Sequence, residues 1–234
     1  MTNIKPEDLL SLINERRSIR KYLKAPVEWE HIGMILEAGR NAPSAGNLQN
    51  WRFIVVMDKD KREKIAETCL RQYWMSSAPV HIVIVAQTEK AKMFYGERGE
   101  KLYSTQNCAA AAMNMMLQAH ACGLATCWVG AFDEDMMKNT LGCGGDAHPQ
   151  IVLTLGYPDE QAPTPKKNPL AEVTDLEDYG NKIKDVDVVL HRWGNVMQKK
   201  SKVAKEKLDE TAEQVEKNYS GVINKIKNKF GKKD

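Results

Sequence analysis

The side chains best suited to chemistry lie in a short basic cluster, Arg16-Arg17-Ser18-Ile19-Arg20, near the N-terminus. Arginine presents a planar fork of N–H donors that matches phosphate oxygens, and a serine hydroxyl can complete such a cradle. Considered alone, the cluster is better explained as a solvated surface or as charge that compensates the end of a preceding helix. Three guanidiniums with a hydroxyl among them exceed what helix compensation needs, so an anion site is the alternative hypothesis.

A second polar stretch supports that hypothesis. It reads Pro43-Ser44-Ala45-Gly46-Asn47-Leu48-Gln49-Asn50-Trp51 and is rich in amides and in turn-forming residues. Such a loop is suited to hydrogen-bonding a planar polar ligand, although Asn47 and Gln49 could equally stabilise the loop itself.

No arrangement of side chains in the sequence indicates acid–base, nucleophilic or metal chemistry. The five histidines are scattered, and the five cysteines include no CxxC pair, which favours reduced thiols in a cytosolic protein. The glycine-rich stretch 142–145 lacks the context of a dinucleotide or phosphate-binding loop. If the protein is an enzyme, the difficult step belongs to a cofactor.

Taken together, the two polar stretches resemble the nitroreductase family of FMN-dependent oxidoreductases. That family begins with Arg-(Arg/His)-Ser-x-(Arg/Lys), followed by a Pro-Ser-x-x-Asn-x-Gln-x-Trp loop, and the resemblance extends from Ile4 to Leu170. It implies an α+β fold, a three-layer α-β-α sandwich with a mixed, mainly antiparallel sheet, and a homodimer that binds FMN at its interface.

The resemblance also implies roles for the charged residues. Arg16 and Ser18 match residues that grip the ribityl-phosphate of the flavin, with Arg17 beside them. Arg20 matches a cation near the pyrimidine edge, where positive charge stabilises the anion that develops at N1 and O2 on reduction. Lys167 matches a basic residue that closes over the phosphate, although the family more often has arginine there.

The resemblance implies roles for uncharged residues as well. The loop that reaches the flavin from the partner subunit is matched by Pro43, Ser44, Ala45, Asn47 and Gln49. The segment under the isoalloxazine is matched by Trp128, Val129, Gly130 and Ala131. Gln72 matches an amide contact, and the backbone N–H of Gly130 is the candidate donor to flavin N5, where glycine allows close approach. Taken singly, Trp128 is better explained as a packing residue, and Arg192 is a phosphate-contact candidate by charge alone.

The implied function is transfer of hydride from NADH or NADPH to flavin N5, and then to an electron-poor acceptor such as a nitroaromatic or quinone, in ping-pong order. No catalytic side chain is expected, and the sequence does not choose between NADH and NADPH. Two alternatives stay open. One is a family branch with other flavin chemistry, namely reductive dehalogenation or flavin fragmentation. The other is a non-catalytic flavin-binding or scaffold protein.

Hydrophobic periodicity predicts the elements that must position these residues. Helices are expected at 6–17, 27–40, 61–71, 104–122 and 134–141. Strands are expected at 53–57, 79–86, 124–132 and 151–155. The charged segment 90–101 has no clean periodicity and is expected to be exposed. The helix at 104–122 is apolar nearly all round, which fits either a core helix or the dimer interface.

Length and composition suit one large domain, 1–194, with an amphipathic helical tail at 195–234. The tail holds eleven lysines against six acidic residues, whereas the rest of the chain has a net charge of −2. This balance argues against nucleic-acid binding by the body. The tail's 4-3 apolar spacing fits packing on the body, self-association or contact with an anionic membrane.

The sequence gives no indication of targeting out of the cytoplasm. The N-terminal residues are polar, and the longest apolar run, 78–86, is only as long as a strand. A cytoplasmic protein without a transmembrane segment is therefore expected.

Overall fold

The computed structural model describes residues 4–183. These fall into two compact units, one that ends at Thr164 and one that begins at Pro165, and each is described by itself. The predicted boundary at 194/195, the tail and Arg192 lie outside the described residues. Within residues 4–183, no helix is long and apolar enough to cross a membrane.

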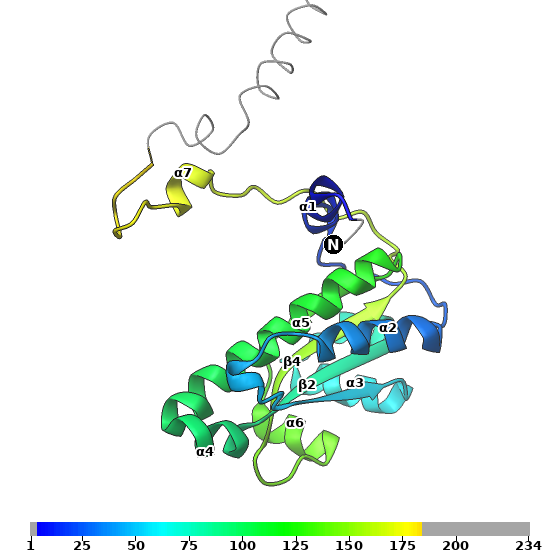
Figure 1. Ribbon diagram of the computed structural model, residues 1–234. Coiled ribbons are helices and arrows are strands. Elements are labelled where there is room, and N and C mark those ends of the chain that lie inside the picture. Colours follow the sequence, from blue (N-terminus) through cyan, green and yellow to red (C-terminus); the bar gives the residue numbers. More distant parts are fainter. Residues whose placement is uncertain (1–3, 184–234) are drawn as a thin grey trace, which may run out of the picture. The chain divides into compact units, whose positions relative to one another are not determined.

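The first unit is built on a sheet of four strands in the order β1-β2-β4-β3 (Figure 1). The strands are β1 (Trp51–Val56), β2 (Val80–Gln87), β3 (Ala125–Val129) and β4 (Ala147–Gly156). All three ladders are antiparallel. A parallel element comes from the isolated bridge between Ser18 and Thr126. The predicted mainly antiparallel sheet is thereby confirmed, and its parallel component among residues 4–183 is this bridge.

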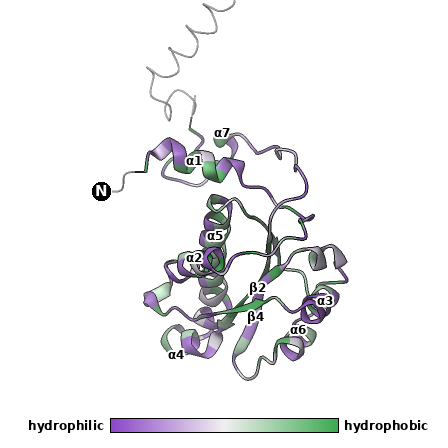
Figure 2. Ribbon diagram, turned by 90° about the vertical axis from the view of Figure 1, so that its right-hand side faces the viewer, coloured by the Kyte–Doolittle hydropathy of each residue, from purple (hydrophilic) through white to green (hydrophobic). Residues whose placement is uncertain are grey.

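Helices cover both faces of this sheet (Figure 2). Helices α2 (Trp29–Arg40) and α5 (Ser104–Ala121) pack on one face, and α3 (Lys59–Thr68) and α6 (Glu134–Leu141) on the other. Side chains alternate along a strand, so Ile82 and Ile84 of β2 enter the first core while Val83 and Val85 enter the second. The predicted three-layer α+β architecture is correct.

Small residues bring α2 and α5 close together. A Cβ atom added to Gly39 would lie 2.2 Å from Cε of Met115, so a larger residue there would have to displace the methionine. The face of α5 that contains Met115 is fully buried, whereas Met113 is 40% exposed. Of the two interpretations left open for this helix, the structure shows the core role, and a role at the dimer interface stays a prediction.

The largest difference from the predicted elements is at residues 88–103. Here the chain forms α4 (Thr88–Arg98) and a π-helical turn, η3 (Gly99–Tyr103), with a break at Gly96, whose φ is +61°. Charged and apolar side chains alternate irregularly around α4, so the segment gives no helical periodicity. Helix α1 (Pro6–Glu15) ends two residues before the predicted position, because the following residues turn towards β3.

The remaining elements are short. The first unit also contains the 3₁₀ turns η1 (Ala45–Asn47) and η2 (Tyr73–Ser77), and the second contains α7 (Leu170–Val173). In the second unit, a bridge between Asp175 and Lys182 closes a hairpin, and the Lys182 ammonium lowers the pKa of the Asp175 carboxyl.

His81 on β2 is completely buried and ties the strand to η2. Its Nε2 lies 3.0 Å from the Met75 carbonyl oxygen, which can only accept, so this nitrogen carries the proton. Nδ1 is buried without a hydrogen-bond partner among residues 4–183. Burial disfavours the charged imidazolium and lowers the pKa of His81 to about 4.

His81 should therefore make the protein sensitive to acid. Its folded-state pKa lies below the ordinary value of 6.5, so the unfolded chain binds the proton first as the pH falls. The free energy of unfolding should drop by about 3 kcal/mol between pH 6.5 and pH 4 through this group alone. His81→Gln should flatten that slope in denaturant titrations, with each variant referenced to its own stability at pH 7.5. An unchanged slope would contradict this assignment.

Candidate functional site

The segment that follows α1 pairs with the edge of β3 and carries the basic cluster. Ser18 forms a parallel bridge with Thr126, and the Ile19 N–H donates to the Thr126 carbonyl at 3.1 Å. The buried Tyr22 hydroxyl donates to the Ile19 carbonyl at 2.5 Å and lies 2.7 Å from Oγ1 of Thr154 on β4. Burial raises the pKa of Tyr22, so this anchor stays uncharged.

Residues 158–164 form a second wall beside the basic cluster. The carboxylate Oε1 of Glu160 accepts from two successive backbone N–H groups, those of Arg20 at 2.5 Å and Lys21 at 3.2 Å. Further along, Nη2 of Arg17 donates to Oγ1 of Thr164 at 2.9 Å. Residues 160–164 are thus attached to the cluster, and Arg17 is engaged within the protein.

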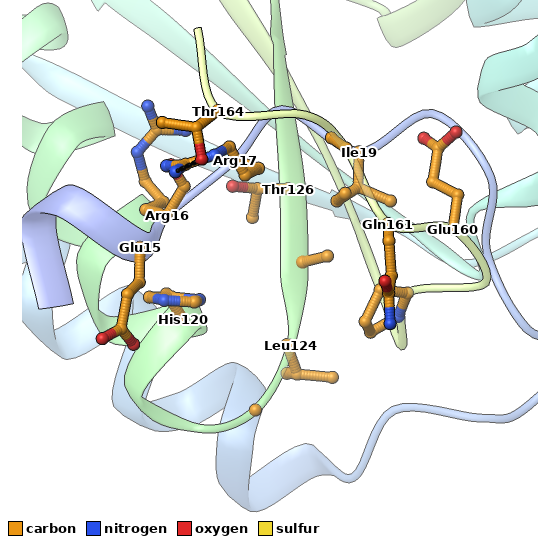
Figure 3. A pocket seen from close by; sticks show the side chains of 14 residues that line it. Glu15, Arg16, Arg17, Ile19, His120, Leu124, Thr126, Glu160, Gln161 and Thr164 are labelled. Carbon is orange, nitrogen blue, oxygen red and sulfur yellow. Dashed lines mark hydrogen bonds between the residues drawn. The ribbon is translucent and has the colours of Figure 1, made fainter. Parts of the chain in front are cut away.

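A pocket of about 440 Å³ lies between these two walls and the start of β3 (Figure 3). Arg16, Arg17 and Thr164 lie at one end of it in this view, and His120 and Leu124 lie towards the other. The lining residues are Glu15, Arg16, Arg17, Ile19, His120, Gly123, Leu124, Ala125, Thr126, Pro158, Glu160, Gln161, Ala162 and Thr164.

Two polar atoms at this pocket are buried without a hydrogen-bond partner among residues 4–183. They are Nη1 of Arg16 and Oγ1 of Thr126. An unsatisfied buried donor costs about 1–3 kcal/mol, and more when the group is charged. Such a cost in a native structure needs an explanation, and an anionic ligand that accepts from the guanidinium provides one.

Arg20 and Gln72 are brought together by a residue that the sequence analysis did not single out. The Arg20 guanidinium lies over the ring of Trp74, 5.7 Å from its centroid, and Trp74 Nε1 donates to Oε1 of Gln72 at 3.3 Å. Trp74 follows Gln72, a predicted amide contact, by two positions, and this closeness in sequence could have identified it.

The end of β3 continues from the pocket through the predicted segment Trp128–Ala131. Val129 is buried in the core, Trp128 is 37% exposed, and Gly130 and Ala131 are exposed. A Cβ atom at Gly130 would lie 3.4 Å from Trp128 Nε1, an ordinary van der Waals contact, so the indole lies beside this stretch of backbone without itself requiring glycine there.

The predicted loop after α2 is internally hydrogen-bonded. The Gln49 N–H donates to Oγ of Ser44 at 3.0 Å, and Gln49 Nε2 donates to Oδ1 of Asn47 at 3.1 Å. Asn47 and Gln49 both have positive φ, 53° and 48°, which is uncommon for residues other than glycine. Backbone strain of this kind is found at ligand-binding sites, so the loop fits both interpretations of its amides.

A buried amide network fixes this loop to the start of α5. Oδ1 of Asn107 accepts from the Ala45 N–H at 3.0 Å, and Asn107 Nδ2 donates to Oδ1 of Asn50 at 2.7 Å. Asn50 Nδ2 in turn donates to Oγ of Ser104 at 2.9 Å. Sequence reasoning missed Asn107, although an asparagine in an otherwise apolar helix was a usable signal.

The structure does not bring this loop and the basic cluster together within one chain. The loop is attached at Asn107, near the start of α5, whereas His120, near its end, lines the pocket with Arg16 (Figure 1). At 1.5 Å per residue, these two positions on α5 are about 20 Å apart. Lys167 belongs to the second unit, where it is exposed.

Metal chemistry finds no support in the part of the chain that the structure covers. Residues 4–183 contain no group of three histidine, cysteine or acidic side chains arranged to hold a metal ion. The buried thiols are also poorly suited to act as nucleophiles, because burial raises the pKa of Cys69 to about 11 and that of Cys108 to about 12.

Comparison with known proteins identifies the family of the chain. The model of the nitroreductase family matches residues 13–74 and 67–157. An NADH dehydrogenase of Thermus thermophilus is 32% identical over 186 residues, which cover 68% of this chain and 91% of that protein. An FMN reductase (NAD(P)H) of Bacillus subtilis is 26% identical over 187 residues, with 74% and 75% covered.

Solved structures give the same result. An FMN-dependent nitroreductase from Clostridium difficile superposes with a TM-score of 0.64 and 27% identity, covering 73% of this chain and 99% of that one. For Bacillus megaterium NfrA2, the TM-score is 0.69 over 85% of each chain, at 22% identity, which supports the fold alone. The chain therefore belongs to the nitroreductase family.

Proposed function

We propose that the protein is an FMN-dependent oxidoreductase that passes hydride from NADH or NADPH to an electron-poor acceptor such as a nitroaromatic or a quinone. Membership of the nitroreductase family supports this proposal, as do relatives whose names specify FMN and NAD(P)H. Bound FMN supplies the redox chemistry, because its N5 can take up a hydride and release it again.

The observation that carries the proposal is Nη1 of Arg16, which is buried at the pocket without a hydrogen-bond partner among residues 4–183. A phosphate oxygen would satisfy this donor with a charge-assisted hydrogen bond, so the residues present fit the phosphate of FMN. Ser18 follows two residues later on the strand-like segment that bridges Thr126, although it does not itself line the pocket. Arg17, which already binds Thr164, has the role of shaping the pocket.

The remaining predicted residues would orient the rest of the cofactor. Arg20 supplies positive charge for the pyrimidine edge, and Gln72 supplies an amide beside it. Gly130 permits a flat ring to approach the main chain closely, since it has no Cβ. The chain's own contribution is therefore binding and orientation, without a dedicated side-chain acid or base.

The protein is further proposed to act as a homodimer with FMN at the interface. The loop 43–49 and the pocket lie about 20 Å apart along α5, so a loop that contacts the same flavin would come from a second copy. Helix α1 has no buried residue in the described chain, and Leu9, Leu10 and Ile13 on it are 47%, 57% and 44% exposed. An unpartnered apolar face of this kind fits a subunit contact.

The direct test is an absorbance spectrum of the purified full-length protein, followed by anaerobic addition of NADH and then of NADPH. A flavin spectrum that either donor bleaches, and that a quinone or nitroaromatic restores, is the expected result. A colourless protein that takes up no FMN would overturn the proposal.

Arg16→Gln should weaken FMN binding about tenfold to a hundredfold, because hydrogen bonds to charged groups contribute about 1.5–3 kcal/mol. The dissociation constant can be measured by titrating the deflavinated protein with FMN and following flavin fluorescence. Arg52→Gln, which removes an exposed arginine from β1, is the matched control and should leave the constant unchanged. Equal constants for wild type and Arg16→Gln would contradict the phosphate assignment.

A site shared between subunits should be restored by mixing two defective chains. One chain carries Arg16→Gln and the other carries Asn47→Ala with Gln49→Ala. At an FMN concentration that saturates wild type but leaves both variant homodimers mostly empty, the tagged and purified heterodimer should bind one FMN per two chains. If the heterodimer stays as empty as the homodimers, the loop and Arg16 serve the same chain.

A further inference from the structure

Both the backbone and the side chain of Arg20 make contacts that hold the residue in place. Its backbone N–H donates to the Glu160 carboxylate at 2.5 Å, and the next N–H, that of Lys21, donates to the same oxygen at 3.2 Å. Its guanidinium lies 5.7 Å from the centroid of the Trp74 ring, within the range of a cation–π interaction. The residue is exposed, so these contacts limit a side chain that would otherwise sample many rotamers.

The indole of Trp74 is itself held in place. Its Nε1 donates to Gln72 at 3.3 Å, and its ring packs against the cluster formed by Ile19, Tyr22 and Ala78. Contacts of this kind fix both the plane and the position of the ring, as a platform for a cation requires.

The turn that carries Trp74 is also anchored by long side chains. Nη1 of Arg62 donates to the carbonyls of Ser76 at 2.8 Å and Ala78 at 2.6 Å, and His81 binds the Met75 carbonyl at 3.0 Å. Three carbonyl groups in and beside η2 are therefore tied to α3 and β2. The platform is connected to the core of the unit and not only to its own loop.

We propose that Trp74 is a positioning residue that directs the Arg20 guanidinium towards the bound flavin. The inference rests on the proposed function, because it takes Arg20 as the cation at the pyrimidine edge. A guanidinium held in one orientation stabilises negative charge on the reduced flavin more than a mobile one, because no reorganisation is needed when the charge appears. Trp74 acts through Arg20 and does not itself need to touch the flavin.

The test is the midpoint potential of FMN in the full-length holoprotein, measured by anaerobic dye equilibration. Trp74→Leu removes the aromatic face and should reduce the preference for reduced over oxidised FMN by about three- to tenfold, which lowers the potential by about 15–30 mV for a two-electron couple. Trp74→Phe keeps a π face and should recover most of the wild-type value. Trp74→Met also lacks a π face but is similar in reach, and it should lower the potential by the same amount. It replaces Trp74→Leu in the test if the leucine variant folds poorly.

The same substitutions in an Arg20→Gln background separate positioning from a general structural effect. With the guanidinium removed, Trp74→Leu should leave the potential unchanged, because the coupling between the two residues has been lost. An equal fall in both backgrounds, or no fall in either, would overturn the inference. A wild-type protein without FMN would instead overturn the proposed function, so the two failures are distinguishable.

Discussion

The pairing of residues 18–22 with the edge of β3 is the constraint on which the site depends. Main-chain hydrogen bonds fix Ile19 against Thr126, and the buried Tyr22 hydroxyl locks the same segment to β4 through Thr154. Side chains on a segment with strand-like geometry point in alternate directions. This pairing buries Ile19, which lines the pocket together with Arg16 and Arg17. A helix continuing from α1 would instead have spread these side chains around a cylinder.

The sheet offers a rigid edge for that pairing because each of its faces packs against a hydrophobic core of its own. Strand β2 is covered on both faces, and its alternating side chains feed two separate hydrophobic clusters. The polar groups of the site lie on segments attached to this scaffold from far away in the sequence. Glu160 is 140 residues from Arg20, and Thr164 is 147 residues from Arg17. The scaffold supplies the rigidity that such distant attachments need.

Local signals explain how much of this was predictable. The apolar run of β2 and the long apolar helix α5 have strong patterns, so the layers followed from the sequence, and the resemblance supplied the order of the binding segments. Trp74, Glu160 and Asn107 were missed because each acts through a partner that is distant in sequence, and a single polar or aromatic residue has no periodicity. Helix α4 was not predicted for a related reason, because its surface has no continuous apolar stripe.

Helix α5 also sets the dimensions of the proposed two-chain site. Its first turns hold the loop through Asn107, and its last turn lines the pocket through His120. Each residue inserted between them would lengthen the helix by about 1.5 Å and rotate one end against the other by about 100°. A change in length would therefore misalign both binding regions at once, in every copy of the chain. A surface segment such as α4 precedes Asn107 in the chain, so its length can vary without disturbing this spacing.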